Sequence, residues 1–113
     1  MAKDHVTHIY FTPVKPDRAG KFITFLQTVV QPAVKKAAPQ LAARWKAMEP
    51  ATKDGDRVVF ALVFEGGKLS DWELQPILER ALGAEEAKRA MQEWDDMLDG
   101  DQYGGSFDPV ALG

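Results

Sequence analysis

Alternation of polar and apolar residues predicts a β-strand near the start of the chain, over residues 5–14. Side chains two positions apart point to the same side of a strand. One side of this strand would carry Thr7, Ile9 and Phe11, and the other would carry Val6, His8, Tyr10 and Thr12. Pro13 and Pro16 are expected to end the strand, because proline has no N–H to donate to a neighbouring strand.

Two other segments repeat apolar residues every three or four positions, which is typical of helices with one buried side. The first runs from an expected N-cap at Asp17 to Pro39, with apolar residues at 19, 22, 23, 26, 29, 30, 33, 34 and 37. Pro32 should kink or break this helix near residues 31–32. The second begins at a predicted capping box, Ser70 to Glu73, breaks at Gly83 and continues to Gly100.

Three further strands complete the predicted order of elements. Residues 42–50 and 57–67 are expected to form a hairpin, because Asp54-Gly55 is a strong signal for a two-residue turn. That turn would place Trp45 opposite Phe64, and residues 103–110 would form a short last strand. The order β-α-β-β-α-β predicts one α+β domain over residues 1–113. Its ferredoxin-like plan is a four-stranded antiparallel sheet with both helices on one face.

The strand over residues 58–64 is apolar on both of its sides, although the predicted helices would cover only one face of the sheet. A strand of this kind needs a second layer to bury its other side. Another copy of the chain is the simplest source of that layer. We therefore expect a homodimer joined through the sheet faces.

The element order, the chain length and the two-sided strand resemble the dimeric α+β barrel superfamily. This superfamily includes the antibiotic-biosynthesis monooxygenases, the EthD-like proteins, muconolactone isomerases and small polyketide cyclases. The segments most similar in character are HVTHIYFTPV (5–14), RVVFALVFEGG (57–67) and QYGGSFDPV (102–110). The resemblance implies two sheets packed face to face, with cavities beside them for hydrophobic, often aromatic, ligands. If the chain is an enzyme, it implies cofactor-independent oxygenation, isomerisation or cyclisation.

The chain departs from this family in its polar residues. The quinone-forming monooxygenases typically use an Asn and a Trp, and the related haem-degrading enzymes also use a histidine on a helix. This sequence contains no asparagine, and its two histidines, His5 and His8, both lie in the first predicted strand. Haem degradation is therefore not expected, and the usual monooxygenase site is incomplete.

His8 and Tyr10 are the candidate catalytic residues, because they lie two positions apart on one side of the first strand. A histidine beside a tyrosine in an apolar pocket could transfer a proton near neutral pH. In that hypothesis His8 is the acid or base, and Tyr10 is its partner or an oxyanion donor. The alternative is a hydrogen-bonded, half-buried histidine with a structural role. His5 is expected to face solvent.

Aromatic and apolar residues provide the candidate ligand-binding site. If the hairpin register holds, the floor of a pocket would consist of Trp45, Phe60, Leu62 and Phe64. Trp94 would join it from the last helix, and Trp72 would cover its mouth. The alternative is that these residues pack in the core or in a dimer interface and bind no ligand. Arg44 and Lys46 could attract an anionic ligand or be solvated charges.

Composition excludes several other function classes. There is no cysteine, and the acidic run after Glu85 lacks calcium-loop spacing, so neither a metal nor another cofactor is expected. The net charge of −3 and the lack of a glycine in DRVVFALVF argue against nucleic-acid binding, although RNA-recognition domains share the element order. No apolar run suggests a membrane span or a signal peptide, and a cytoplasmic location is expected.

Two function classes remain open after these exclusions. The first is a small dimeric enzyme that transforms a hydrophobic, aromatic molecule. The second is a non-catalytic ligand-binding or structural dimer of the same fold.

Overall fold

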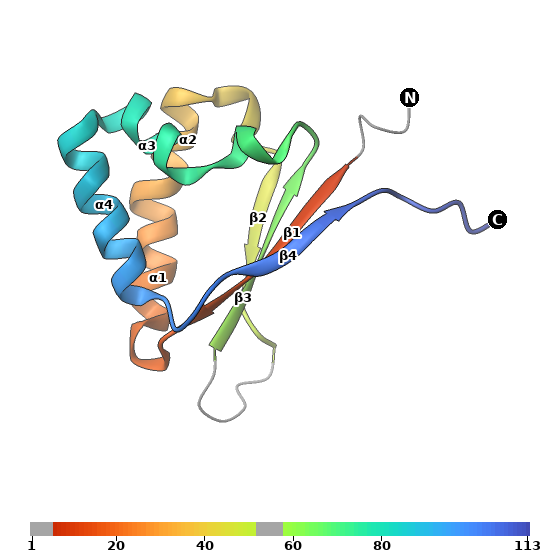
Figure 1. The fold of residues 1–113 in the computed structure, drawn as a ribbon, viewed down its shortest axis with the longest axis horizontal. Helices are drawn as coiled ribbons and strands as arrows, with labels where there is room; N and C mark the ends of the chain where they lie inside the picture. The colour runs from red at the N-terminus through yellow and green to blue at the C-terminus, as the bar shows by residue number, and fades with distance from the viewer. Residues whose placement is uncertain (1–5, 52–57) are drawn as a thin grey trace.

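One antiparallel sheet, with helices covering one of its faces, makes up the computed structural model, which describes residues 6–51 and 58–113 (Figure 1). The strands are β1 (Thr7–Val14), β2 (Trp45–Met48), β3 (Val58–Glu65) and β4 (Tyr103–Phe107). They lie in the order β2-β3-β1-β4, and every neighbouring pair is antiparallel. The helices are α1 (Ala19–Phe25), α2 (Gln31–Ala37), α3 (Leu74–Leu82) and α4 (Ala84–Met97). The predicted four-stranded antiparallel α+β fold is confirmed.

The register of the hairpin between β2 and β3 is also the predicted one. Trp45 lies opposite Phe64 and Ala47 lies opposite Leu62. Just outside β2, the Glu65 amide donates a hydrogen bond to the Arg44 carbonyl at 2.7 Å. The Asp54-Gly55 turn that motivated this register lies outside the described residues, as does His5.

The first long helix does not break at Pro32. Its hydrogen-bonding pattern changes just before the proline instead. Between α1 and α2, residues Leu26–Val30 form a π-helical segment, and the Gln31 amide donates to the Leu26 carbonyl, five residues earlier. A proline inside a regular α-helix lacks an N–H for the carbonyl four residues before it, and its ring presses against that carbonyl. The wider π-helical turn accommodates Pro32 and keeps the buried stripe continuous from α1 into α2.

The ends of the helices differ from the predicted capping positions. Asp17 lies within a 3₁₀ turn, Pro16–Arg18, and makes no capping hydrogen bond. Ser70 lies in another 3₁₀ turn, Leu69–Trp72, and α3 begins only at Leu74. This start places Pro76 in the first turn of α3, where an amide would have no partner inside the helix. The break at Gly83, where φ is 87°, is confirmed.

The second helical segment ends before the predicted Gly100. Helix α4 stops at Met97, and Leu98 is extended and pairs with Val14. The chain can then cross from the helical layer to β4, which runs antiparallel to β1.

The core fills the space between the helical layer and the sheet. Phe22 of α1 is fully buried, with its ring centroid 4.8 Å from Phe60 of β3 and 5.2 Å from Trp94 of α4. The helix-facing side of β1 carries His8, Tyr10 and Thr12, whereas Ile9 and Phe11 point to the other side. No helix within residues 6–51 and 58–113 is long and apolar enough to cross a membrane.

Candidate ligand cavity

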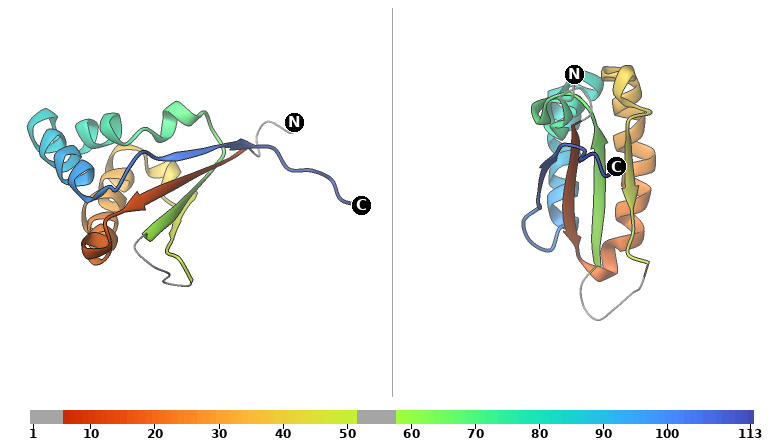
Figure 2. Two further views of the ribbon diagram at one scale, coloured as in Figure 1. Left: turned by 60° about the horizontal axis from the view of Figure 1, so that its bottom comes forward. Right: turned by 90° about the vertical axis from the view of Figure 1, so that its right-hand side faces the viewer.

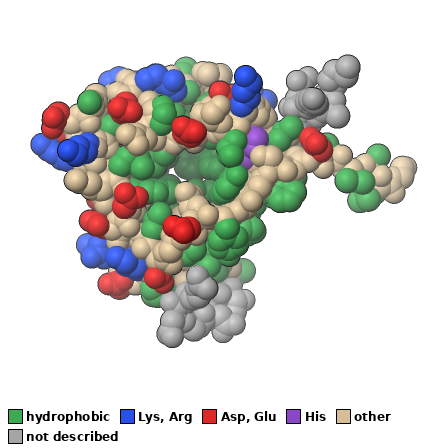
Figure 3. Space-filling model, viewed as in Figure 1, with side chains coloured by type: hydrophobic (Ala, Val, Ile, Leu, Met, Phe, Trp, Pro, Cys, Tyr) green, Lys and Arg blue, Asp and Glu red, His purple; other side chains and the backbone are tan. Residues whose placement is uncertain are grey.

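A cavity of about 490 Å³ lies between the helical layer and the sheet. The space-filling view shows a hollow at this place, with hydrophobic side chains inside it and acidic side chains close to its edge (Figure 3). Helices α2, α3 and α4, the π-helical segment and strands β1, β2 and β3 surround the space, which reaches the surface. Its walls are mostly apolar, as in small-molecule binding sites.

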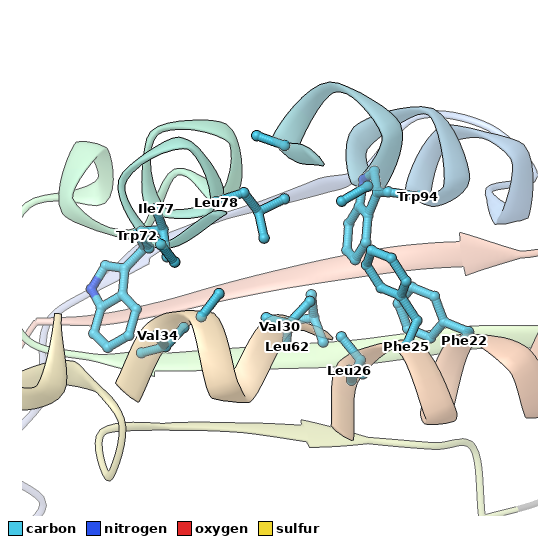
Figure 4. Close-up of a cluster of buried hydrophobic side chains, with 14 of the residues drawn as sticks. Phe22, Phe25, Leu26, Val30, Val34, Leu62, Trp72, Ile77, Leu78 and Trp94 are labelled. Atoms are coloured by element: carbon cyan, nitrogen blue, oxygen red, sulfur yellow. The ribbon is translucent and has the colours of Figure 1, made fainter. Parts of the chain in front are cut away.

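Aromatic side chains from separate elements form much of the wall. Trp45 of β2 stacks with Phe64 of β3 at a centroid distance of 6.2 Å, and Phe64 contacts Trp72 at 5.1 Å. Trp72 lies at one end of the cluster in Figure 4 and Trp94 lies toward the other, with side chains of Val30, Val34 and Leu62 between them. This arrangement presents several aromatic surfaces to one space.

Two of the tryptophans are fixed through their indole N–H groups. Trp45 donates to the Gln31 side chain at 2.6 Å, and Gln31 in turn donates to the Ala42 carbonyl at 3.0 Å. Trp72 donates to the Gly66 carbonyl at 2.9 Å. A buried indole is usually held in place by such a partner. The rings of Trp45 and Trp72 are therefore set in place before any ligand arrives.

Five polar side chains belong to the described cavity lining, namely Tyr10, Glu73, Gln75, Glu79 and Gln102. Tyr10 of β1 lies on the sheet side of the cavity, and Gln102 precedes β4, where its side-chain amide donates to the Thr12 hydroxyl at 2.9 Å. Glu73 and Glu79 approach the cavity from the start and the middle of α3, and both side chains are exposed. The side-chain oxygen of Gln102 remains available as an acceptor.

The structure brings most of the predicted ligand-binding residues together. Trp45, Leu62, Phe64 and Trp94 line the cavity together with Tyr10. Phe60 does not line it, because Phe22 covers its ring, and Phe60 instead borders a second pocket beside β2. Binding of a ligand by these residues stays a prediction.

His8 lies on the same side of β1 as Tyr10 but outside the cavity wall. It is 3% exposed, and both of its ring nitrogens have hydrogen-bond partners. Nε2 lies 3.0 Å from the Gly67 carbonyl, which can only accept, so Nε2 carries a proton. In the neutral ring Nδ1 then accepts from the Ser106 hydroxyl at 2.7 Å. The catalytic role of His8 stays a prediction, and this geometry favours the structural alternative.

The His8 hydrogen bonds hold the turn that supports one cavity wall. Gly67 accepts from His8, and the adjacent Gly66 carbonyl accepts from Trp72. The Gly66 amide also donates to the Val6 carbonyl at 2.7 Å. His8 is therefore connected to the cavity through the position of Trp72, not through direct exposure to a ligand.

The sequence interpretation did not identify Gln31, Gln102, Glu73 or Glu79 as parts of the site. The sequence contained only a weak indication that Gln102 belongs to the site, namely its position immediately before the last predicted strand. Glu73 was assigned to the predicted capping box, and Glu79 resembled an ordinary solvated helix residue. Arg44 and Lys46, which had been candidates for attracting an anion, do not line this cavity. In the part of the chain that the structure describes, no three His, Asp or Glu side chains group as metal ligands would.

Solved structures share this arrangement of elements, although their sequences are very different. No family model matches the chain, and no curated protein matches it. A NIPSNAP family protein of unknown function from Agrobacterium tumefaciens superposes with a TM-score of 0.64 and 7% identity, over 100% of this chain and 95% of that one. A putative antibiotic biosynthesis monooxygenase from Caulobacter crescentus superposes with a TM-score of 0.58 and 14% identity, over 97% of this chain and 93% of that one.

A second protein described as a putative antibiotic biosynthesis monooxygenase, from Nitrosomonas europaea, gives a TM-score of 0.55 at 10% identity, over 99% of this chain and 96% of that one. The chain has the fold of these proteins. The resemblance drawn from the sequence is thus confirmed at the level of the fold. Identities this low establish the fold alone, so the function has to be argued from the cavity.

Proposed function

We propose that this protein binds a flat, hydrophobic, aromatic small molecule in the cavity between the helices and the sheet. The observation that carries the proposal is an open space of about 490 Å³ whose walls include Trp45, Phe64, Trp72 and Trp94. Ligand sites for small organic molecules are usually about 300–1,000 Å³ and largely apolar, with a few polar groups that set orientation. Tyr10 and Gln102 are suited to that orienting role.

Energy transfer from tryptophan to anthracene tests this proposal. We expect saturable binding of anthracen-9-ylmethanol, detected as anthracene emission on excitation of the wall tryptophans. Leu69→Trp should weaken binding by about tenfold, because a larger side chain at the mouth narrows the entrance. Leu82→Trp is the matched control: both leucines are 41% exposed, but Leu82 lies away from the cavity. Absence of saturable binding, or equal loss in both variants, contradicts the proposal.

Chemical transformation of the ligand is the second candidate function. It is favoured by the position of Tyr10 at the cavity and by the fold, which is shared with two proteins described as putative monooxygenases. A tyrosine hydroxyl can orient a substrate or stabilise a developing oxyanion. Oxygenation, isomerisation or cyclisation would then require Tyr10, with His8 holding the wall near Trp72.

Product analysis distinguishes an enzyme from a non-catalytic binding protein. Once a bound ligand is identified, it is incubated with the protein in air and without oxygen, and the products are analysed by mass spectrometry. Tyr10→Phe should retain binding but lose turnover. Unchanged ligand in both incubations favours the non-catalytic alternative.

We also propose that the protein is a homodimer joined through the sheet face opposite the helices. The right-hand view of Figure 2 shows the strands in front of the helices, and none of the described helices lies over that face. Large apolar side chains lie there in the described residues, namely Phe11, Met48, Tyr103 and Phe107, each between 38% and 54% exposed. The cavity lies on the helical side of the sheet, so dimerisation would leave it open.

A further inference from the structure

Among the described residues, all the charged side chains at the cavity are acidic. Glu73 and Glu79 are the charged residues within the lining, and no described Lys or Arg belongs to it. Lys68 and Arg80 are neighbours in sequence, but they are exposed and line no part of the cavity. Neither glutamate takes part in an ion pair within residues 6–51 and 58–113. Their negative charges are therefore available to a molecule at the mouth.

The aromatic walls favour the same sign of charge. The face of an aromatic ring carries partial negative charge, and it attracts an ammonium group within about 6 Å of its centre, most strongly in tryptophan. Trp45, Phe64 and Trp72 form a continuous series of contacts along one wall. A cation in this space would lie close to aromatic rings as well as carboxylates, whereas a carboxylate ligand would be repelled by the two glutamates.

We infer that the ligand of this cavity is an aromatic molecule carrying a cationic amino group. The inference rests on the proposed binding function and adds the charge of the ligand to it. The apolar rings would occupy the space between Trp72 and Trp94, and the ammonium group would lie toward Glu73 and Glu79. The earlier expectation that Arg44 and Lys46 attract an anion points to the opposite ligand charge, but those residues are not at this cavity.

Three anthracene compounds of equal ring size test this inference. Anthracen-9-ylmethylamine is cationic at neutral pH, anthracen-9-ylmethanol is uncharged, and anthracene-9-carboxylate is anionic. We expect the amine to bind about tenfold more tightly than the alcohol, and the carboxylate to bind more weakly still. Raising the salt concentration from about 0.05 M to about 0.5 M should reduce the preference, because the two carboxylates are exposed to screening ions.

Neutral substitutions at the mouth test whether Glu73 and Glu79 cause the preference for the amine. The double variant Glu73→Gln and Glu79→Gln should reduce the preference for the amine over the alcohol to about threefold or less. Glu73 makes no capping hydrogen bond to α3, and both side chains are exposed, so the double variant should fold normally. Glu93→Gln is the control: it removes one negative charge, against two in the double variant, from a position on α4 away from this cavity, and it should keep the preference.

The outcomes distinguish the inference from the proposed function. If the alcohol binds and the amine binds no better, or if the carboxylate binds best, the inference is overturned and the binding function stands. If none of the three compounds binds saturably, both fail. If Glu93→Gln reduces the preference as much as the double variant does, the effect comes from net charge and the assignment to the cavity mouth is wrong.

Discussion

At the scale of single residues, His8 illustrates how burial changes the meaning of a chemically suggestive side chain. Its position two residues before Tyr10 suggests a proton-transfer pair, but its ring nitrogens contact Ser106 and Gly67 instead. Tyr10 borders the cavity and His8 does not. Of the two residues, only Tyr10 is therefore positioned to contact a ligand, and His8 connects β1 to β4 and to the turn before α3.

Replacing His8 tests this structural role. His8→Ala should lower the free energy of unfolding by about 1–3 kcal/mol, because it leaves the Gly67 carbonyl without its donor and removes a buried ring. Ser106→Ala should lower the free energy of unfolding by less, because Ser106 is exposed and water can replace its hydroxyl. Urea unfolding followed by circular dichroism measures both. An unchanged midpoint for His8→Ala would show that these hydrogen bonds contribute nothing to stability.

At the scale of elements, the close pairing of β1 and β4 depends on one glycine. Gly104 lies opposite Tyr10, and a Cβ atom at this position would collide with the Ile9 carbonyl and lie 2.8 Å from the Tyr10 Cα. The adjacent Gly105 has room, because its Cβ would be 3.8 Å from the Phe107 ring. Gly104 therefore sets the approach of β4 to β1, and with it the position of Gln102.

Alanine substitutions at the two glycines form a matched pair. Gly104→Ala should destabilise the protein by about 1–3 kcal/mol, because β4 must move away from β1 to make room for the methyl group. It should also weaken binding of anthracen-9-ylmethanol through the displacement of Gln102 and Tyr10. Gly105→Ala should change stability by less than about 0.5 kcal/mol. Thermal unfolding and ligand titration measure the two effects, and similar behaviour of the variants would contradict the prediction.

Two local signals predicted the structure well, whereas the capping signals at Asp17 and Ser70 did not mark the helix starts. The Trp45–Phe64 register follows from turn chemistry, and the break at Gly83 follows from backbone freedom. The π-helical segment before Pro32 and the late start of α3 were not predicted. Both depend on how the chain accommodates a proline while keeping its apolar stripe on the core, and a proline alone does not reveal which solution is used.

The cavity was less predictable than the fold for a related reason. Strand β3 is apolar on both sides, so alternation does not reveal which side the helices cover. The aromatic residues of β2 and β3 could be grouped from the register. The contributions of α3, including Glu73 and Glu79, depend on where that helix crosses the sheet. A helix position of this kind results from tertiary packing, which no local pattern records.

At the scale of the whole molecule, strand β1 reverses the usual distribution of polar residues between the two faces of the sheet. Strand β1 places His8, Tyr10 and Thr12 toward the helices, whereas Ile9 and Phe11 point to the face that no helix covers. Phe11 stacks there on Tyr103 of β4 at a centroid distance of 5.4 Å. A large exposed apolar patch commonly marks an interaction surface. A second copy would bring an identical apolar surface to this face.

Charge introduced on this face should separate the proposed dimer. Phe11→Arg should shift the sedimentation coefficient from dimer to monomer at micromolar concentration, because pairing would bury two unpaired guanidinium groups. Leu82→Arg is the control. Leu82 is 41% exposed and Phe11 is 38% exposed, so the two side chains are similarly accessible, but Leu82 lies at the end of α3 on the helical side. Because the cavity lies on that side too, the Phe11→Arg monomer should still bind anthracen-9-ylmethanol. A wild-type protein that sediments only as a monomer would refute the dimer, and a dimer insensitive to Phe11→Arg but disrupted by Leu82→Arg would move the interface to the helices.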